Sequence, residues 1–279
     1  MSKRTKVLRG IVHILMALYI VVILFPLLWM VLSGFKSDAD IFSSPWSLPE
    51  SWKISNYIYV WTTYIQKSVL NSLFFTVVGT FFVVLISGMA AYAIIRFRFK
   101  HKYLVFMFVL SGMMLAPQCS LIPIYKMLST IGLYNTRIGM LIPYIAYRVP
   151  FSFFLMWSFM LNLPVEVEEA AIIDGCSIRQ VFFNIVLKMS KPVIATTAVM
   201  SARYIWNDFA FALVFSEGRE LQTVPLAIFA IRSTSQTQWG VLIAGLTLAA
   251  LPMVVVYLSA TVLCRWYEFR CCQRIKQEK

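Results

Sequence analysis

Long apolar stretches dominate the chain, and six of them are long enough to cross a membrane. A spanning helix needs about 20 mostly apolar residues. The pattern predicts spans near residues 10–35, 69–95, 103–125, 138–161, 193–215 and 240–264. Shorter polar segments separate these runs. We therefore expect an all-α polytopic membrane protein with six transmembrane helices, in which residues 1–279 form a single transmembrane domain.

Prolines lie inside several of the predicted spans: Pro26, Pro117, Pro123, Pro143, Pro150 and Pro252. A spanning helix tolerates proline because neighbouring helices satisfy the freed backbone groups. We expect kinks at these positions.

Composition supports lipid as the main solvent of this chain. Of its 279 residues, 60% are hydrophobic and only 13% are charged. Soluble domains carry about 45–50% apolar and about 25% charged residues. The chain therefore lacks the charge to coat a water-facing globule, which excludes an ordinary soluble enzyme. Its five cysteines are odd in number and show no metal-site spacing, so we expect free thiols.

The net charge of +13 reflects membrane orientation rather than nucleic acid binding. With the N-terminus inside, the inner segments hold 16 of the 25 Lys and Arg residues, the outer segments hold 7 and the spans hold 2. Both termini and the loops 96–102 and 162–192 are therefore predicted to be cytoplasmic. Segment 36–68 faces out, and its tryptophans and tyrosines are typical of headgroup-level anchors.

The inner loop 162–192 reads NLPVEVEEAAIIDGCSIRQVFFNIVLKMSKP and is too long for a simple connector. Pro164 suits the first position of a helix. Gly175 suits a left-handed helix stop, and Ser177 can cap a second helix over 178–187. The loop is therefore predicted to be a helix, a glycine turn and a second helix.

The charge of this loop bears on what it contacts. An amphipathic helix on the bilayer surface is one reading. The stretch, however, holds three bases and four acids, Glu166, Glu168, Glu169 and Asp174. Anionic lipid would repel the first helix. Docking into a groove of another protein is the better interpretation.

The sequence EEAAIIDGCS followed by FFNIVLKMSKP resembles the EAA motif of ABC-importer permease subunits. The residues at the matching positions are Glu169, Ala170, Ala171, Asp174 and Gly175. Further fragments are similar to the carbohydrate-uptake, maltose-transporter-type subfamily: FPLLWMVLSGFKSDADIF at 25–42, Asn71-Ser72-Leu73, Ala91-Tyr92-Ala93 with Arg96, LIPIYKMLSTIGLYNT at 121–136, and Trp206-Asn207-Asp208-Phe209. The resemblance covers residues 20–255, most of the chain.

The resemblance implies a type I ABC importer permease fold and import of a solute by alternating access. It implies four kinds of partner: two cytoplasmic ATPase subunits, a second permease subunit, an extracytoplasmic solute-binding protein and membrane lipid. The subfamily usually pairs two different permease chains, and pairing with a second copy of this chain stays open. The EAA loop would couple the permease to the ATPases. Glu169 and Asp174 would make polar contacts in an ATPase cleft, Ala170 and Ala171 would allow close approach, and Gly175 would fix the angle of the helix.

Two features depart from the family pattern. Lys188 stands where the family usually has a proline, whereas Pro192 keeps the second proline. The C-terminal tail, LCRWYEFRCCQRIKQEK, lacks the usual glycine-containing ending. No ATPase contact of the usual tail is therefore carried over to this chain.

Charged residues within spans mark function, because an unpaired charge in lipid is costly. Arg148, Arg203 and Asp208 are the three instances. They either line the translocation path or pair across a permease–permease interface. Three neutral polar residues, Asn71, Gln118 and Asn207, are candidates of the same kind, with helix–helix hydrogen bonding as the plainer reading.

No catalytic or metal site is predicted. The phosphate-binding pattern G-x-x-x-x-G-K-[ST] is absent, and the two histidines, His13 and His101, are far apart. The chain should hold no cofactor, and ATP and Mg²⁺ would be bound by the partner ATPases. Two other classes stay open, an ion-coupled secondary carrier and a membrane-embedded enzyme. The solute cannot be read from the residues, and only the resemblance favours a sugar or oligosaccharide.

Overall fold

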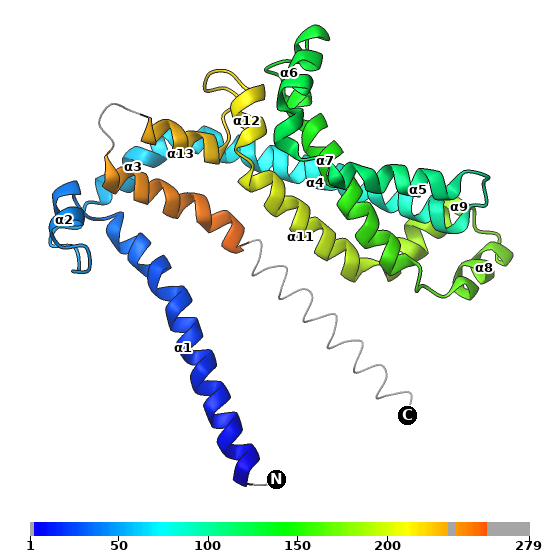
Figure 1. The fold of residues 1–279 in the computed structure, drawn as a ribbon, viewed down its shortest axis with the longest axis horizontal. Coiled ribbons are helices and arrows are strands. Elements are labelled where there is room, and N and C mark those ends of the chain that lie inside the picture. Colours follow the sequence, from blue (N-terminus) through cyan, green and yellow to red (C-terminus); the bar gives the residue numbers. More distant parts are fainter. Residues whose placement is uncertain (1–2, 234–237, 256–279) are drawn as a thin grey trace. The chain divides into compact units, whose positions relative to one another are not determined.

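A computed structural model describes residues 3–233 and 238–255. Within these ranges every regular element is a helix, and no strand is present. The chain groups into two compact units, residues 1–66 with 227–251 and residues 67–226 with 252–279. Figure 1 shows the helices with their labels. The fold is that of an all-α polytopic membrane protein.

Three helices of the described chain are long and apolar enough to cross a membrane: Ile11–Ser33, Ile54–Arg96 and Arg137–Met160. Two further stretches pass the same test only as bent pairs. The predicted sixth span is described only in part, as the apolar helix Trp239–Val255. The rest of that prediction lies outside the described residues, so the count of six spans stays a prediction.

The predicted third span, 103–125, is broken in the structure. The structure has α5 (Lys102–Ser111) and η2 (Gly112–Met114), then η3 (Pro117–Ser120) and α6 (Leu121–Thr130), with a bend of 94° between the two halves. Leu115 and Ala116 are extended at the bend. The residue before a proline avoids the helical region, and Ala116 precedes Pro117.

The predicted fifth span, 193–215, is also interrupted. It consists of α11 (Lys191–Asn207) and α12 (Ala210–Phe215). Asp208 between them is extended, with ψ 130°. Its Oδ2 accepts hydrogen bonds from the backbone amides of Phe211 at 3.0 Å and Ala212 at 3.3 Å, so the carboxylate caps α12.

The unit formed by residues 1–66 and 227–251 contains α1 (Lys3–Ser33), α2 (Asp38–Ser43), α3 (Ile54–Val60) and the π-helical turn η1 (Trp61–Ile65). Side-chain bonds to backbone hold the segment after α1. Lys36 is buried and its Nζ donates to the carbonyls of Ser44 and Pro45, both at 3.0 Å. None of the span window of α1 is buried within the described chain, so this helix faces lipid or another chain.

The aromatic residues of segment 36–68 fold back onto the end of α1. Trp46 stacks on Phe25 with ring centroids 5.8 Å apart, and Trp52 packs against Phe35 at 5.3 Å. Both tryptophans stay exposed. This arrangement suits rings that lie at the headgroup level, which remains the interpretation taken from the sequence.

The unit formed by residues 67–226 and 252–279 is built on α4 (Gln66–Arg96), α7 (Arg137–Met160) and α11. Two apolar clusters hold it together. The first includes Tyr92, Phe153, Met156, Ala171 and Phe182, and the second includes Phe75, Tyr144, Ile205, Phe211 and Phe215. A short helix that the sequence analysis did not predict, α13 (Val224–Arg232), follows α12.

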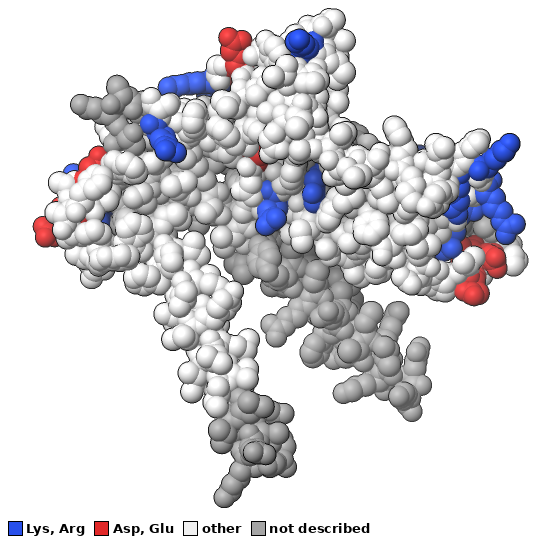
Figure 2. Space-filling view, viewed as in Figure 1, with Lys and Arg blue, Asp and Glu red and all other residues white. Residues whose placement is uncertain are grey.

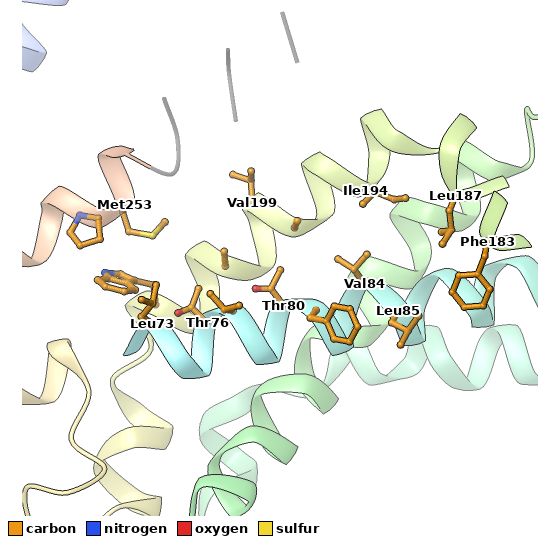
Figure 3. A pocket seen from close by; sticks show the side chains of 16 residues that line it. Leu73, Thr76, Thr80, Val84, Leu85, Phe183, Leu187, Ile194, Val199 and Met253 are labelled. Atoms are coloured by element: carbon orange, nitrogen blue, oxygen red, sulfur yellow. The ribbon is translucent and has the colours of Figure 1, made fainter. Parts of the chain in front are cut away.

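An open groove lies between α4 and α11 in this unit (Figure 3). Its volume is 730 Å³, and its lining is apolar apart from Thr76 and Thr80. Figure 3 shows Leu73, Val84 and Leu85 of α4 opposite Ile194 and Val199 of α11. Such a lining suits acyl chains or another apolar helix and gives a hydrated solute no polar partners.

Candidate functional site

The loop after α7 forms two helices joined by a turn, as predicted. Helix α8 runs over Val165–Ile173. The second helix begins as α9 (Ile178–Val181) and continues through the π-helical turn η4 (Phe182–Val186) into α10 (Leu187–Met189), two residues beyond the predicted end. Pro164 is the N-cap of α8 rather than its first helical residue. Ser177 caps the second helix in a reciprocal pair with Gln180.

Gly175 makes the turn between these helices. Its φ is +87°, in the left-handed region that favours glycine. The amide of Gly175 donates to the carbonyl of Ile172 and that of Cys176 to the carbonyl of Ala171, both at 3.0 Å. These two bonds form a Schellman motif, which ends the helix and fixes the direction of the chain after it. A Cβ at this position would meet nothing within 4 Å, so the constraint is the backbone conformation.

One face of α8 packs against its own chain. Glu168 and Ala171 are buried, and Ala171 belongs to the cluster that contains Tyr92 and Met156. The two alanines of the motif therefore differ, because Ala170 is exposed. The close approach expected of both to a partner protein is open only to Ala170.

Glu168 is held by the end of α4. Its Oε1 accepts from the Arg96 guanidinium, with Nη2 at 2.6 Å and Nε at 3.0 Å, and its Oε2 accepts from the Tyr92 hydroxyl at 3.1 Å. Arg96 Nη2 also donates to the Leu163 carbonyl at 3.3 Å. This pairing was not predicted, because in the sequence Glu168 is one of several acids in the first turns of the loop helix. Glu168 and Ala171 are three residues apart and therefore share one face of the helix, and this spacing could have distinguished Glu168 from Glu169.

The opposite face of α8 is open. Glu166, the adjacent pair Glu169 and Ala170, and Ile173 follow one another at helical spacing and are exposed, and Asp174 comes next. Ile173 is 86% exposed, which is unusual for so large an apolar side chain. Helices α5, α8 and α9 meet at one end of the unit that contains α4 and α7, and Figure 2 shows acidic and basic side chains gathered there. The arrangement is an exposed apolar tip flanked by carboxylates.

Of the neutral polar residues predicted within spans, only Asn71 is buried. Its Nδ2 donates to the carbonyls of Glu220 at 2.7 Å and Gln222 at 3.2 Å. It therefore joins α4 to the loop before α13 rather than to another helix. Gln118 is exposed in η3. Asn207 is exposed, and its Nδ2 donates to the Arg203 carbonyl of its own helix at 2.8 Å.

The charged residues predicted within spans have different surroundings. Asp208 Oδ2 accepts from the Tyr144 hydroxyl at 3.2 Å, in addition to its capping bonds. The Arg148 guanidinium lies over the rings of Phe151 at 4.5 Å and Tyr204 at 5.1 Å. Arg203 is exposed. Within residues 3–233 and 238–255, neither arginine forms an ion pair.

The described residues hold no group of three His, Cys, Asp or Glu side chains that could bind a metal ion. Cys119 and Cys176 are free thiols. Lys188 is exposed on α10. The atypical tail, with Cys264, Cys271 and Cys272, lies outside the described residues.

The model of the family described as "Binding-protein-dependent transport system inner membrane component" matches residues 84–270. The chain belongs to this family. It is 42% identical over 247 residues to the probable ABC transporter permease protein YurM of Bacillus subtilis, covering 88% of this chain and 82% of that protein. It is 34% identical over 251 residues to the diacetylchitobiose uptake system permease protein NgcG of Streptomyces coelicolor, covering 89% and 83%.

The fold of the permease is also that of a solved importer. A crystal structure of a bacterial ABC transporter involved in the import of the acidic polysaccharide alginate matches with a TM-score of 0.78 at 21% identity, covering 94% of this chain and 98% of that one. The permease is thus a multi-pass membrane subunit of an ABC importer. Permeases of this family are not enzymes, and membership decides against both the enzyme and the ion-coupled carrier.

Proposed function

We propose that this permease imports a sugar or oligosaccharide across the cell membrane and is driven by separate ATPase subunits that grip the exposed face of α8. The observation that supports this proposal is that one face of α8 is buried against the permease and the other is exposed. Glu168 and Ala171 fasten one face to the permease, while Glu166, Glu169, Ala170 and Ile173 stay open on the other. Exposed apolar anchors at helical spacing suit docking into a protein groove.

The remaining partners follow from the family. Its members belong to binding-protein-dependent systems, so an extracytoplasmic solute-binding protein delivers the solute. The resemblance of the EAA loop adds two cytoplasmic ATPases and a second, different permease subunit. ATP and Mg²⁺ are bound by the ATPases, because this chain contains no G-x-x-x-x-G-K-[ST] sequence. A sugar solute is supported by the relative named for diacetylchitobiose uptake.

The orientation is part of the same proposal. Both termini and loop 162–192 face the cytoplasm, because the inner segments hold most of the Lys and Arg residues. Residues 1–279 act as a single transmembrane domain, and loop 162–192 is its coupling element. Glu169 and Asp174 supply the polar contacts to the ATPase cleft, and Gly175 sets the angle of α8.

The test replaces Glu169 by Lys in the complete importer and measures solute uptake and solute-stimulated ATP hydrolysis. Both should be lost while the amount of permease in the membrane stays normal. Glu217→Lys is the matched control, since Glu217 is an exposed acid of the loop between α12 and α13. Wild-type uptake and coupling in Glu169→Lys would refute the coupling role. Profiling the ligands of the solute-binding protein identifies the solute.

A further inference from the structure

Two arginines stand at the middle of adjacent spanning stretches. Arg148 is the twelfth of the 24 residues of α7, and Arg203 is the thirteenth of the 25 residues from Lys191 to Phe215. The two stretches pack together, and the Ser152 and Ser201 hydroxyls share a hydrogen bond of 3.2 Å between them. Both arginines therefore lie near the middle of predicted spans that pack against each other.

A charge exposed to hydrocarbon within a span is costly. Arg203 is exposed and Arg148 is half-buried, and the described chain provides no carboxylate partner for either. Asp208, the carboxylate nearest in sequence, uses Oδ2 for the α12 cap and for Tyr144. The surface that carries the arginines therefore faces water or a polar partner and not lipid, in contrast to the apolar groove between α4 and α11 (Figure 3).

The surroundings of Arg148 suit recognition of an anionic group. Its guanidinium is stacked on Phe151 and Tyr204, and stacking holds the plane while leaving edge N–H groups available. Its Nε is buried, and no group of the described residues accepts its hydrogen. Planar, bidentate carboxylate recognition is the chemistry that arginine performs best.

We propose that Arg148 and Arg203 form a positively charged site in the translocation path, and that it takes a saccharide bearing a carboxylate or another anionic group. This inference rests on the proposed function and narrows its solute class. Two guanidinium groups without a carboxylate between them attract an anion, whereas a neutral sugar leaves their charge uncompensated. The rings of Phe151 and Tyr204, which stack on the Arg148 guanidinium, hold its charge at the wall of the translocation path.

The test measures the reaction of single cysteines with charged, membrane-impermeant methanethiosulfonates in the assembled importer, after all five native cysteines have been replaced. The reporter is Asn207→Cys, exposed one turn from Arg203 on α11, with both arginines intact. Arg203→Cys is the second reporter. We expect both to react, and Phe154→Cys, an exposed apolar position of α7, to stay unreactive. If the reporter cysteines react no faster than Phe154→Cys, the arginines do not lie in the translocation path.

The charge preference is tested on the same reporter. The ratio of the rate with the sulfonatoethyl reagent to that with the trimethylammonioethyl reagent should fall several-fold in Arg148→Gln and in Arg203→Gln. Arg137→Gln is the matched control, because Arg137 also lies over a ring, that of Phe74, but at the end of α7. An unchanged ratio overturns the anionic site. If the ratio is unchanged but Glu169→Lys still abolishes uptake, the anionic site is wrong and the proposed function is still supported.

Discussion

Arg96 Nη2 lies 2.6 Å from Oε1 of Glu168, and this pair joins the end of α4 to α8. Both side chains are mostly buried, with 18% and 7% of their surfaces exposed. A displacement of α8 by a docked partner must therefore move α4 or break a charge-assisted contact in a low-dielectric setting. The Tyr92 hydroxyl adds a second bond from the same helix. These contacts attach loop 162–192 to the end of α4.

Breaking this pair should be costly. Removal of one partner of a buried ion pair costs about 3–5 kcal/mol, because the other charge is left uncompensated. Glu168→Arg and Arg96→Glu should each lower the unfolding temperature of the purified importer and its uptake. The exchanged pair, Arg96→Glu with Glu168→Arg, should recover part of both losses. Glu169→Gln is the control and should leave the unfolding temperature unchanged, since Glu169 is exposed. A double variant no better than the sum of the single ones argues against the pair.

The turn at Gly175 offers a matched comparison within the chain. Gly175 and Gly132 have φ values of +87° and +72°, and an added Cβ meets nothing within 4 Å at either. Valine at either position should cost a similar backbone strain, about 1–2 kcal/mol. Uptake should fall several-fold in Gly175→Val and remain in Gly132→Val and in Gly175→Asn, because asparagine tolerates a positive φ. Equal losses in both valine variants would assign the effect to general stability.

Asp208 should act as a cap and not as a proton carrier. Its carboxylate accepts from two amides of α12, and asparagine keeps an acceptor there. Asp208→Asn should retain most uptake, whereas Asp208→Ala should lose about 1 kcal/mol of stability, the usual cost of removing a cap. Uptake by membrane vesicles and thermal unfolding measure the two effects. Abolished uptake in a stable Asp208→Asn importer would give the carboxylate a role in transport itself.

Asn71 should hold the loop between α12 and α13 in place. Asn71→Leu removes the donors to the carbonyls of Glu220 and Gln222, and an unpaired buried acceptor costs about 1–3 kcal/mol. The loosened loop should become a trypsin site at Arg219, which limited digestion followed by mass spectrometry detects. Asn207→Leu, which loses only a bond within its own helix, should leave the digestion pattern unchanged. Resistance of Asn71→Leu to trypsin would contradict the role of these bonds.

Local sequence was enough for the loop but not for its attachment. Gly175 and Ser177 identify the turn and the second helix, because a left-handed stop and a capping box depend on neighbouring residues alone. The contact between Arg96 and Glu168 joins residues 72 apart, and only the packed structure separates Glu168 from Glu169. The same limit applies to Asn71, whose partners lie 149 and 151 residues away.

The breaks in the spans were predicted less well. Pro117 predicts a kink but not its size, which is 94° in the structure. The break at Asp208 carries no proline or glycine signal, and it follows from a carboxylate that caps α12 instead of continuing α11. Apolar runs therefore predicted where helices lie and not where they break.

We propose that an ATPase subunit binds the open face of α8. Cross-linking from Ile173, the most exposed apolar side chain of this helix, tests that proposal. Ile173→Cys in the assembled importer should cross-link to a cysteine placed in the cleft of the ATPase subunit, with a yield that changes when ATP binds. Ile122→Cys, an exposed apolar position of α6, serves as the control and should give no such product. An importer that transports solute while Ile173→Cys cross-links to no ATPase position would contradict the account.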